Sequence, residues 1–301
     1  MRDKIRQLLK ERNAIMLAHN YQPPEIQDLA DLCGDSLELS IKASRTDAAV
    51  ILFCGVHFMA ETASILSPDK TVLLPREDAG CPMADMIDPE SLQAMLAKLP
   101  PMPVVTYVNS TAAVKALSTI CCTSANIIEV ISSLEEKEIL LTPDKNLSRF
   151  AALRTDKKIH AWEGYCPTHD KLKIEDVQRA KAAHPEAVFI AHPECRPEVQ
   201  DVADAILSTS GMIRYAQSSS EKTFIVGTET GLLYPLKKAN PEKVFYPAAA
   251  KMVCPNMKKI SLEDIADSLE FMEGEVKVPQ KIRRPAFKAV QGMIDLALKK
   301  K

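Results

Sequence analysis

The sequence lacks the features of several classes of protein. It has 38 lysines and arginines against 40 aspartates and glutamates, and no basic run is interleaved with aromatic residues, so nothing indicates nucleic-acid binding. No apolar stretch reaches the roughly 18 residues that a membrane span needs, and residues 1–10 are too charged for a signal peptide. We therefore expect a cytoplasmic protein with neither a nucleic-acid partner nor a membrane partner.

Two further absences concern the cysteines and the linkers. The chain has eight cysteines but no Cys-x-x-Cys pair, which is the usual signature of a structural zinc site. In a reducing compartment we expect these cysteines to be buried thiols, metal ligands or catalytic groups rather than disulfides. No low-complexity segment divides the 301 residues, and 46% of them are hydrophobic, so any modules should pack tightly around a large core.

Three of the cysteines are followed by proline and are almost evenly spaced. Cys81, Cys166 and Cys254 are separated by intervals of 85 and 88 residues. Even spacing of one reactive residue type predicts an internal repeat, in which each copy delivers one thiolate to a common point. The plain alternative is that each is a small buried hydrophobic residue, as most lone cysteines are.

Other polar residues recur with the same period. Each copy opens with an apolar run that predicts a β-strand, and each run ends in a polar or aromatic side chain. A hydroxyl follows 17 residues later in every copy, before a stretch that predicts a helix, where an N-cap residue belongs. The ends of the three runs are His19, Tyr107 and His192, and the hydroxyl residues are Ser36, Ser124 and Thr209.

Each copy contains three strand-like runs in all. They are 14–19, 50–53 and 71–74 in the first copy, 104–107, 138–141 and 158–161 in the second, and 188–192, 223–226 and 243–246 in the third. Helical stretches are expected between them, at 37–43, 127–134 and 212–216. Alternation of strands and helices favours parallel sheets covered on both faces, which carry functional groups beyond the carboxyl ends of their strands.

These patterns predict an α/β fold of three modules. Each module is expected to be a three-layer α/β/α unit with a small parallel sheet, and the three should surround a central active site about a pseudo-threefold axis. The expected boundaries are 1–100, 101–184 and 185–301, the last including an amphipathic C-terminal helix over residues 280–301. The recurring side chains of all three copies would then face one cavity.

Three separated thiolates without a fourth ligand fit a cubane iron–sulfur cluster that has one open iron. Such an iron acts as a Lewis acid toward a substrate hydroxyl or carboxylate, so dehydration or condensation is the expected chemistry. Three other functions stay open: an iron–sulfur hydro-lyase acting on a small hydroxy-diacid, a zinc-dependent lyase or hydrolase, and a non-catalytic repeat scaffold. His169, three residues after Cys166, is either a further ligand for zinc or a core residue.

Eight strings in the chain resemble the quinolinate synthase family, the A proteins of de novo NAD biosynthesis. They are LAHNYQ (17–22), GDSL (34–37), GVHFMAE (55–61), YVNS (107–110), CTSAN (122–126), HPEC (192–195), GTE (227–229) and CPNMKK (254–259). The resemblance covers the chain from about Ile15 to Lys259. It implies a pseudo-threefold single-chain fold and an oxygen-sensitive [4Fe-4S] cluster.

The resemblance also implies the reaction. Members of this family of transferases condense iminoaspartate with dihydroxyacetone phosphate to give quinolinate, and release phosphate and two waters. An L-aspartate oxidase or dehydrogenase is then expected to supply iminoaspartate by transient handover, because this imine hydrolyses readily.

Residue by residue, the resemblance assigns roles within the site. Cys81, Cys166 and Cys254 match the family's cluster ligands, which leaves one iron for substrate or water. The matched substrate-binding positions are His19, Ser36, Tyr107, Asn109, Ser124, His192, Glu194 and Thr209. We expect Glu194 to be the base, with a pKa raised by its surroundings, and Tyr21 to be the acid.

Four further residues have a less specific pattern. For His57 and Glu61, a role in the pocket and a role in packing both stay open. Cys121 and Cys122 have no counterparts in the other two copies, so they are expected to be buried thiols.

Overall fold

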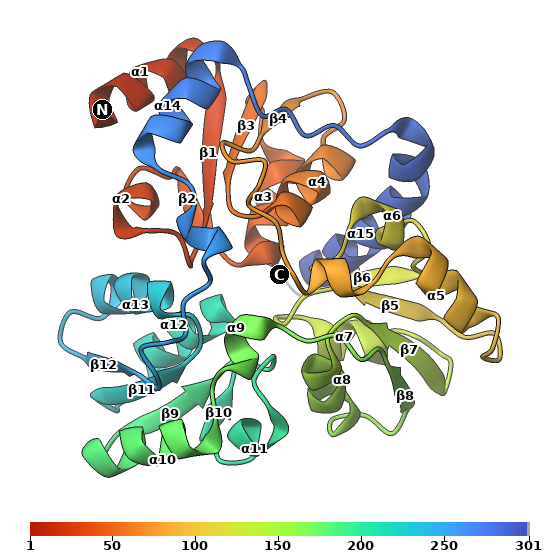
Figure 1. The fold of residues 1–301 in the computed structure, drawn as a ribbon, viewed down its shortest axis with the longest axis vertical. Coiled ribbons are helices and arrows are strands. Elements are labelled where there is room, and N and C mark those ends of the chain that lie inside the picture. Colours follow the sequence, from red (N-terminus) through yellow and green to blue (C-terminus); the bar gives the residue numbers. More distant parts are fainter. Residues whose placement is uncertain (300–301) are drawn as a thin grey trace.

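Three parallel sheets of four strands each form the framework (Figure 1). The computed structural model describes residues 1–299. Its strands are β1 (Ala14–His19), β2 (Leu32–Gly34), β3 (Val50–Cys54) and β4 (Thr71–Leu73) in the first sheet, β5 (Val104–Tyr107), β6 (Ile120–Cys122), β7 (Glu138–Thr142) and β8 (Lys158–Ala161) in the second, and β9 (Val188–Ala191), β10 (Ala205–Ile206), β11 (Thr223–Gly227) and β12 (Val244–Pro247) in the third.

The three sheets share one topology. Their strand orders are β2-β1-β3-β4, β6-β5-β7-β8 and β10-β9-β11-β12, and neighbouring strands are parallel in all three. In each sheet, the second strand of the module lies on one side of the first strand, and the third and fourth strands lie on its other side. The order in which strands are added therefore reverses next to the first strand. Ligands of open parallel sheets bind beyond the carboxyl ends of strands at such a reversal. The predicted α/β fold of three similar modules is therefore confirmed.

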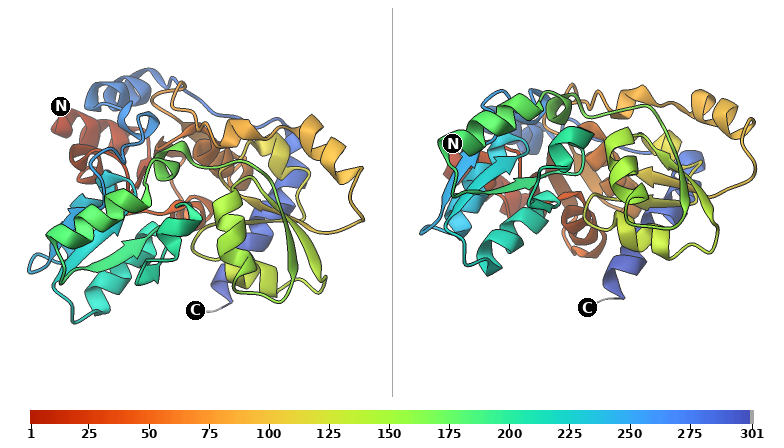
Figure 2. Two further views of the ribbon diagram at one scale, coloured as in Figure 1. Left: turned by 60° about the horizontal axis from the view of Figure 1, so that its bottom comes forward. Right: turned by 90° about the horizontal axis from the view of Figure 1, so that it is seen from below.

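Helices connect the strands and cover the sheets (Figures 1 and 2). In chain order they are α1 (Arg2–Glu11), α2 (Pro24–Gln27), α3 (Ser36–Arg45), α4 (His57–Leu66), η1 (Ala84–Met86), α5 (Pro89–Leu96), α6 (Ala112–Lys115), α7 (Ile127–Ser132), α8 (Lys145–Ala152), α9 (Pro167–Asp170), α10 (Ile174–Ala183), α11 (Pro197–Gln200), α12 (Thr209–Ser218), η2 (Thr230–Leu232), α13 (Leu233–Ala239), η3 (Asn256–Lys258), α14 (Leu262–Phe271) and α15 (Gln280–Leu298). Within residues 1–299, no helix has both the length and the apolar character to cross a membrane.

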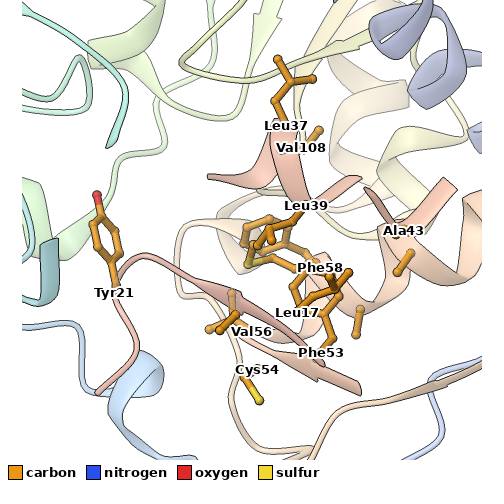
Figure 3. Packing of buried hydrophobic residues seen from close by; sticks show 14 of the residues in the cluster. Leu17, Tyr21, Leu37, Leu39, Ala43, Phe53, Cys54, Val56, Phe58 and Val108 are labelled. Atoms are coloured by element: carbon orange, nitrogen blue, oxygen red, sulfur yellow. The ribbon is translucent and has the colours of Figure 1, made fainter. Parts of the chain in front are cut away.

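Burial explains the composition of the strands. All five residues of β3 are buried, as are the last five of β1, so both strands are continuous apolar runs rather than alternating ones. This is the pattern of a parallel strand that has helices on both faces. Figure 3 shows this packing in the first module, where Leu17 and Phe53 lie among the clustered side chains while the ring of Tyr21 stands apart from them.

Each sheet has one strand more than the patterns predicted. The additional strands β2, β6 and β10 contain only two or three residues, and they pair beside the first strand of their module. A run that short has no detectable period, so three strands per module was wrong.

The C-terminal segment returns to the first two modules. Helix α15 packs against α4 of the first module and against α6 and β6 of the second, while α14 packs against α1. The helix predicted at 280–301 is confirmed over Gln280–Leu298, and residues 300–301 lie outside the described chain. The module boundaries themselves stay a prediction.

A glycine turn holds this segment to the edge of the first sheet. Gly274 has a φ of +82°, its carbonyl accepts the N–H of Leu74, and a Cβ at this position would overlap the carbonyl oxygen of Leu74. We expect Gly274→Ala to destabilise the protein by about 3 kcal/mol and to lower its melting temperature. Gly292→Ala in α15 is the control, because its Cβ meets Ile120 at an ordinary 3.5 Å. Equal melting temperatures for the two variants would contradict the strain at Gly274.

Candidate active site at the meeting of the three modules

One cavity collects all twelve residues to which the family resemblance assigned a role in the site. It lies where the three modules meet, and side chains from all three line it. The predicted site residues in its lining are His19, Tyr21, Ser36, Cys81, Tyr107, Asn109, Ser124, Cys166, His192, Glu194, Thr209 and Cys254. His57 and Glu61 are not in this lining, and the Glu61 carboxylate accepts the N–H of Ala112 at 2.9 Å. Cys121 and Cys122 are fully buried thiols, as predicted.

Two histidines at strand ends have the same local geometry. The backbone N–H of Tyr21 donates to Nδ1 of His19 at 3.2 Å, and that of Glu194 donates to Nδ1 of His192 at 3.4 Å. Burial lowers the pKa of both imidazoles to about 3, so both are neutral near pH 7. A neutral ring that accepts at Nδ1 carries its proton on Nε2. Each histidine therefore offers one Nε2–H donor, which in His192 faces Ser124 Oγ at 3.2 Å.

The hydroxyl residues are not the helix caps that the sequence predicted. The N-caps of α3, α7 and α12 are Asp35, Asn126 and Ser208. Ser36 and Thr209 are instead the first residues of their helices, and Ser124 lies two residues before Asn126. Asp35 and Ser208 already accept N–H groups of the first turn, so the hydroxyls of Ser36 and Thr209 are not needed as caps. Both residues line the cavity, and Thr209 Oγ1 also accepts the side-chain amide of Asn20 at 3.0 Å.

The three Cys-Pro cysteines are equivalent in structure. Each precedes a short helical turn, η1, α9 or η3, and one or two backbone N–H groups in or directly before that turn bond to its sulfur. Burial raises the pKa of all three thiols, to about 12 for Cys81, and these N–H bonds oppose the rise. N–H donors directed at sulfur stabilise a thiolate that binds iron. The donor set therefore fits a thiolate-bound metal centre.

The separation of the ligand atoms distinguishes between kinds of centre. Within residues 1–299, the one group of three candidate ligand atoms that lie within 4.8 Å of one another is formed by Cys166, His169 and Glu194. Tetrahedral zinc with bonds of about 2.3 Å would bring its sulfur ligands to roughly 3.8 Å from one another. Cys81, Cys166 and Cys254 do not form such a group, so at least two of their sulfur atoms lie more than 4.8 Å apart, farther than a single zinc ion would hold them.

A continuous chain of hydrogen bonds crosses the cavity wall. Tyr21 Oη lies 2.6 Å from Thr228 Oγ1, which lies 2.8 Å from His169 Nε2. His169 Nδ1 lies 2.7 Å from Glu194 Oε2, and the Tyr107 hydroxyl donates to Glu194 Oε1 at 2.6 Å. The chain joins Tyr21 of the first module to Tyr107 of the second through residues of the third and α9. The sequence suggested only a ligand or core role for His169, and Thr228 belonged to the GTE string without being assigned a role.

The charges along this chain correct one expectation. Burial acts to raise the pKa of Glu194, but the adjacent His169 and His192 and the hydrogen bonds from His169 and Tyr107 outweigh it, so the pKa of this carboxyl is lowered. The predicted rise was wrong because it took no account of these donors. Burial raises the pKa of Tyr21 and Tyr107 well above 10, so both phenols keep their protons. An ionised carboxylate thus lies between Tyr107 and His169, and protonated phenols lie at both ends of the chain.

Comparison with known proteins agrees with this geometry. The family model for quinolinate synthetase A protein (NadA) matches residues 3–295. Proteins named quinolinate synthase from Geobacter sp. (strain M21) and Thermodesulfovibrio yellowstonii are 57% and 55% identical to the chain, and quinolinate synthase 1 from Methanosarcina acetivorans is 54% identical. Each alignment covers 98% of this chain and 97% of the relative. The chain therefore belongs to the quinolinate synthase A protein family, whose members are enzymes of NAD biosynthesis.

Proposed function

We propose that the chain is a cytoplasmic quinolinate synthase that condenses iminoaspartate with dihydroxyacetone phosphate. The carbon atoms of both substrates enter the pyridine ring and its two carboxylates, and one phosphate and two waters leave. The observation that carries the proposal is the meeting of Cys81, Cys166 and Cys254 with acid, base and hydroxyl groups of all three modules in one cavity. Iminoaspartate would be supplied by an L-aspartate oxidase or dehydrogenase.

The three cysteines are proposed as ligands of a [4Fe-4S] cluster. Their N–H bonds, their common place before a helical turn and their spread around the cavity support this assignment. When bound, a cluster with three protein ligands supplies an open iron that acts as a Lewis acid toward a substrate oxygen. Burial keeps the free thiols protonated, so cluster binding releases their protons.

Neutral and dipolar donors are proposed to bind the anionic groups of the substrates. Ser36 and Thr209 begin two ten-residue helices, where the positive end of the helix dipole favours a carboxylate or a phosphate. His19 and His192 add Nε2–H donors. The buried side-chain oxygen of Asn109 has no hydrogen-bond partner in the protein, so a substrate hydroxyl or amine can donate to it.

The hydrogen-bond chain is proposed to move protons. Glu194 is ionised and can accept a proton through Nδ1 of His169, whose Nε2 then takes one from the hydroxyl of Thr228. Thr228 in turn can take the phenolic proton of Tyr21. Used in the opposite order, the same hydrogen bonds return a proton from Glu194 to Tyr21. Tyr107 keeps one carboxylate oxygen of Glu194 in place.

Removal of the middle hydroxyl tests the relay. Thr228→Val has nearly the same shape but cannot bridge Tyr21 and His169. We expect turnover to fall by about a hundredfold, while the iron content stays at the wild-type level. Thr230→Val, at the start of η2, is the control, because its side chain is outside the cavity lining. Unchanged turnover in Thr228→Val would contradict the relay.

The function itself is tested by the products. Anaerobically purified protein with iminoaspartate and dihydroxyacetone phosphate is expected to form one quinolinate for each phosphate released. Dehydration of a hydroxy-diacid without use of the triose phosphate would instead show an iron–sulfur hydro-lyase. Activity that requires zinc would favour the lyase or hydrolase and would point to the group of Cys166, His169 and Glu194.

A further inference from the structure

Two buried carboxylates occupy equivalent places behind the cysteines. Asp144 lies two residues after β7 and Glu229 two residues after β11, and both side chains are fully buried. The backbone N–H of Cys166 donates to Oδ2 of Asp144 at 3.2 Å. In the same way, the backbone N–H of Cys254 donates to Oε1 of Glu229 at 3.2 Å.

The second oxygen of each carboxylate is also occupied. Asp144 Oδ1 accepts the N–H of Leu147 at 2.7 Å in the first turn of α8, and Glu229 Oε2 accepts the N–H of Gly231 at 2.7 Å in η2. Each carboxylate thus joins the start of a helix to a cysteine. Both oxygens face donors that cannot become acceptors, so only a group with two acceptor oxygens satisfies the arrangement.

Glu229 has a further link to the site. Lys258 Nζ lies 3.1 Å from Oε1 of Glu229 and also donates to the backbone carbonyl of Tyr21. The lysine compensates the buried charge and connects the loop of Cys254 to the loop of Tyr21. The first module differs, because the position two residues after β3 is Val56, which has no polar side-chain atom.

We infer that Asp144 and Glu229 are positioning residues that hold Cys166 and Cys254 in the conformation that binds the cluster. The inference rests on the proposed cluster and adds to it residues that bind neither iron nor substrate. Groups that orient metal ligands typically change metal affinity by 10- to 100-fold when they are replaced. A hydrogen bond to the backbone N–H of the cysteine holds its Cα in place, and with it the point from which the sulfur extends. When that bond is lost, the cysteine is held less firmly, and the cluster should release iron faster.

The test compares iron retention in Asp144→Asn, Glu229→Gln and wild type. Each amide has one acceptor oxygen, so its NH₂ group must face an N–H donor and one of the two bonds is lost. We expect both variants, reconstituted anaerobically, to lose iron to the chelator bipyridyl at least about tenfold faster than wild type, followed by the visible absorption of the cluster. Asp88→Asn is the matched control, because Asp88 caps α5 with the same type of bond but lies on the surface.

The outcomes separate the inference from the proposed function. Melting temperatures of the metal-free proteins report general loss of stability. The inference expects faster iron release than in Asp88→Asn even where a variant and this control melt at the same temperature. If a variant does not fold, Asp144→Glu or Glu229→Asp, which keep two oxygens at a changed reach, replace it, with faster release again expected. Iron release at the wild-type rate would overturn the inference and leave the cluster in place. A wild-type protein that binds no iron would overturn both.

Discussion

Replacing any one of Cys81, Cys166 and Cys254 with alanine is expected to lower quinolinate formation by at least about a thousandfold. Each cysteine comes from a different module and is the one thiol that this module contributes to the cavity lining. Loss of one of three proposed ligands should prevent stable cluster binding, and with it the Lewis-acid chemistry, which supplies several kcal/mol of transition-state stabilisation. The measurement is the initial rate of quinolinate formation by anaerobically reconstituted variants.

A cysteine outside the cavity provides the control for this result. Cys54 ends β3 and is fully buried, and it does not line the cavity. We expect Cys54→Ala to keep its activity, with only the modest loss of stability that a small core truncation causes. Wild-type rates in all three Cys-Pro variants would show that the cysteines are packing residues, as in the repeat-scaffold alternative.

The second large effect concerns the carboxylate of Glu194. Glu194→Gln cannot accept a proton, and its NH₂ group must face either the Tyr107 hydroxyl or the His169 ring. We expect turnover to fall by about a thousandfold, because general acid–base groups contribute factors of about 10² to 10⁴. The number of irons per chain should stay at the wild-type value, because the proposed ligands are unchanged. The two measurements are turnover and iron content of the same preparation.

Glu198→Gln is the matched control for this variant. Glu198 lies nearby in the sequence, at the start of α11, and its exposed carboxylate is paired only loosely with Arg196 at 3.8 Å. It should have wild-type turnover. If Glu194→Gln instead lost its metal, the carboxylate would be a ligand, and the group of Cys166, His169 and Glu194 would become the metal site.

The repeat made much of this fold predictable from the sequence. Three parallel strands per module were found because each belongs to a run of apolar residues that recurs in the other two modules, and the inner strands β1, β3, β5, β7, β9 and β11 are almost wholly buried. The side chains at their ends were found because the strand, the hydroxyl and the cysteine recur at matching intervals. For the same reason, the twelve residues proposed for the site all line one cavity.

What the sequence did not predict depends on tertiary contacts. The short strands β2, β6 and β10 exist only because a longer neighbour pairs with them. The packing of α14 and α15 against the first and second modules leaves no local signal. Neighbours of Glu194 that are distant in sequence, above all His169, decide the direction of its pKa shift. Thr228 was noticed only as part of the GTE string, and its role was missed because only the fold brings it between Tyr21 and His169.

The most direct test of the account is the metal content of anaerobically purified protein beside a variant in which Cys81, Cys166 and Cys254 are all alanine. We expect about four irons and four sulfides per chain in the wild type and neither in the variant. Zinc in the wild type, or no metal in either protein, would contradict the cluster and with it the proposed role of the three modules.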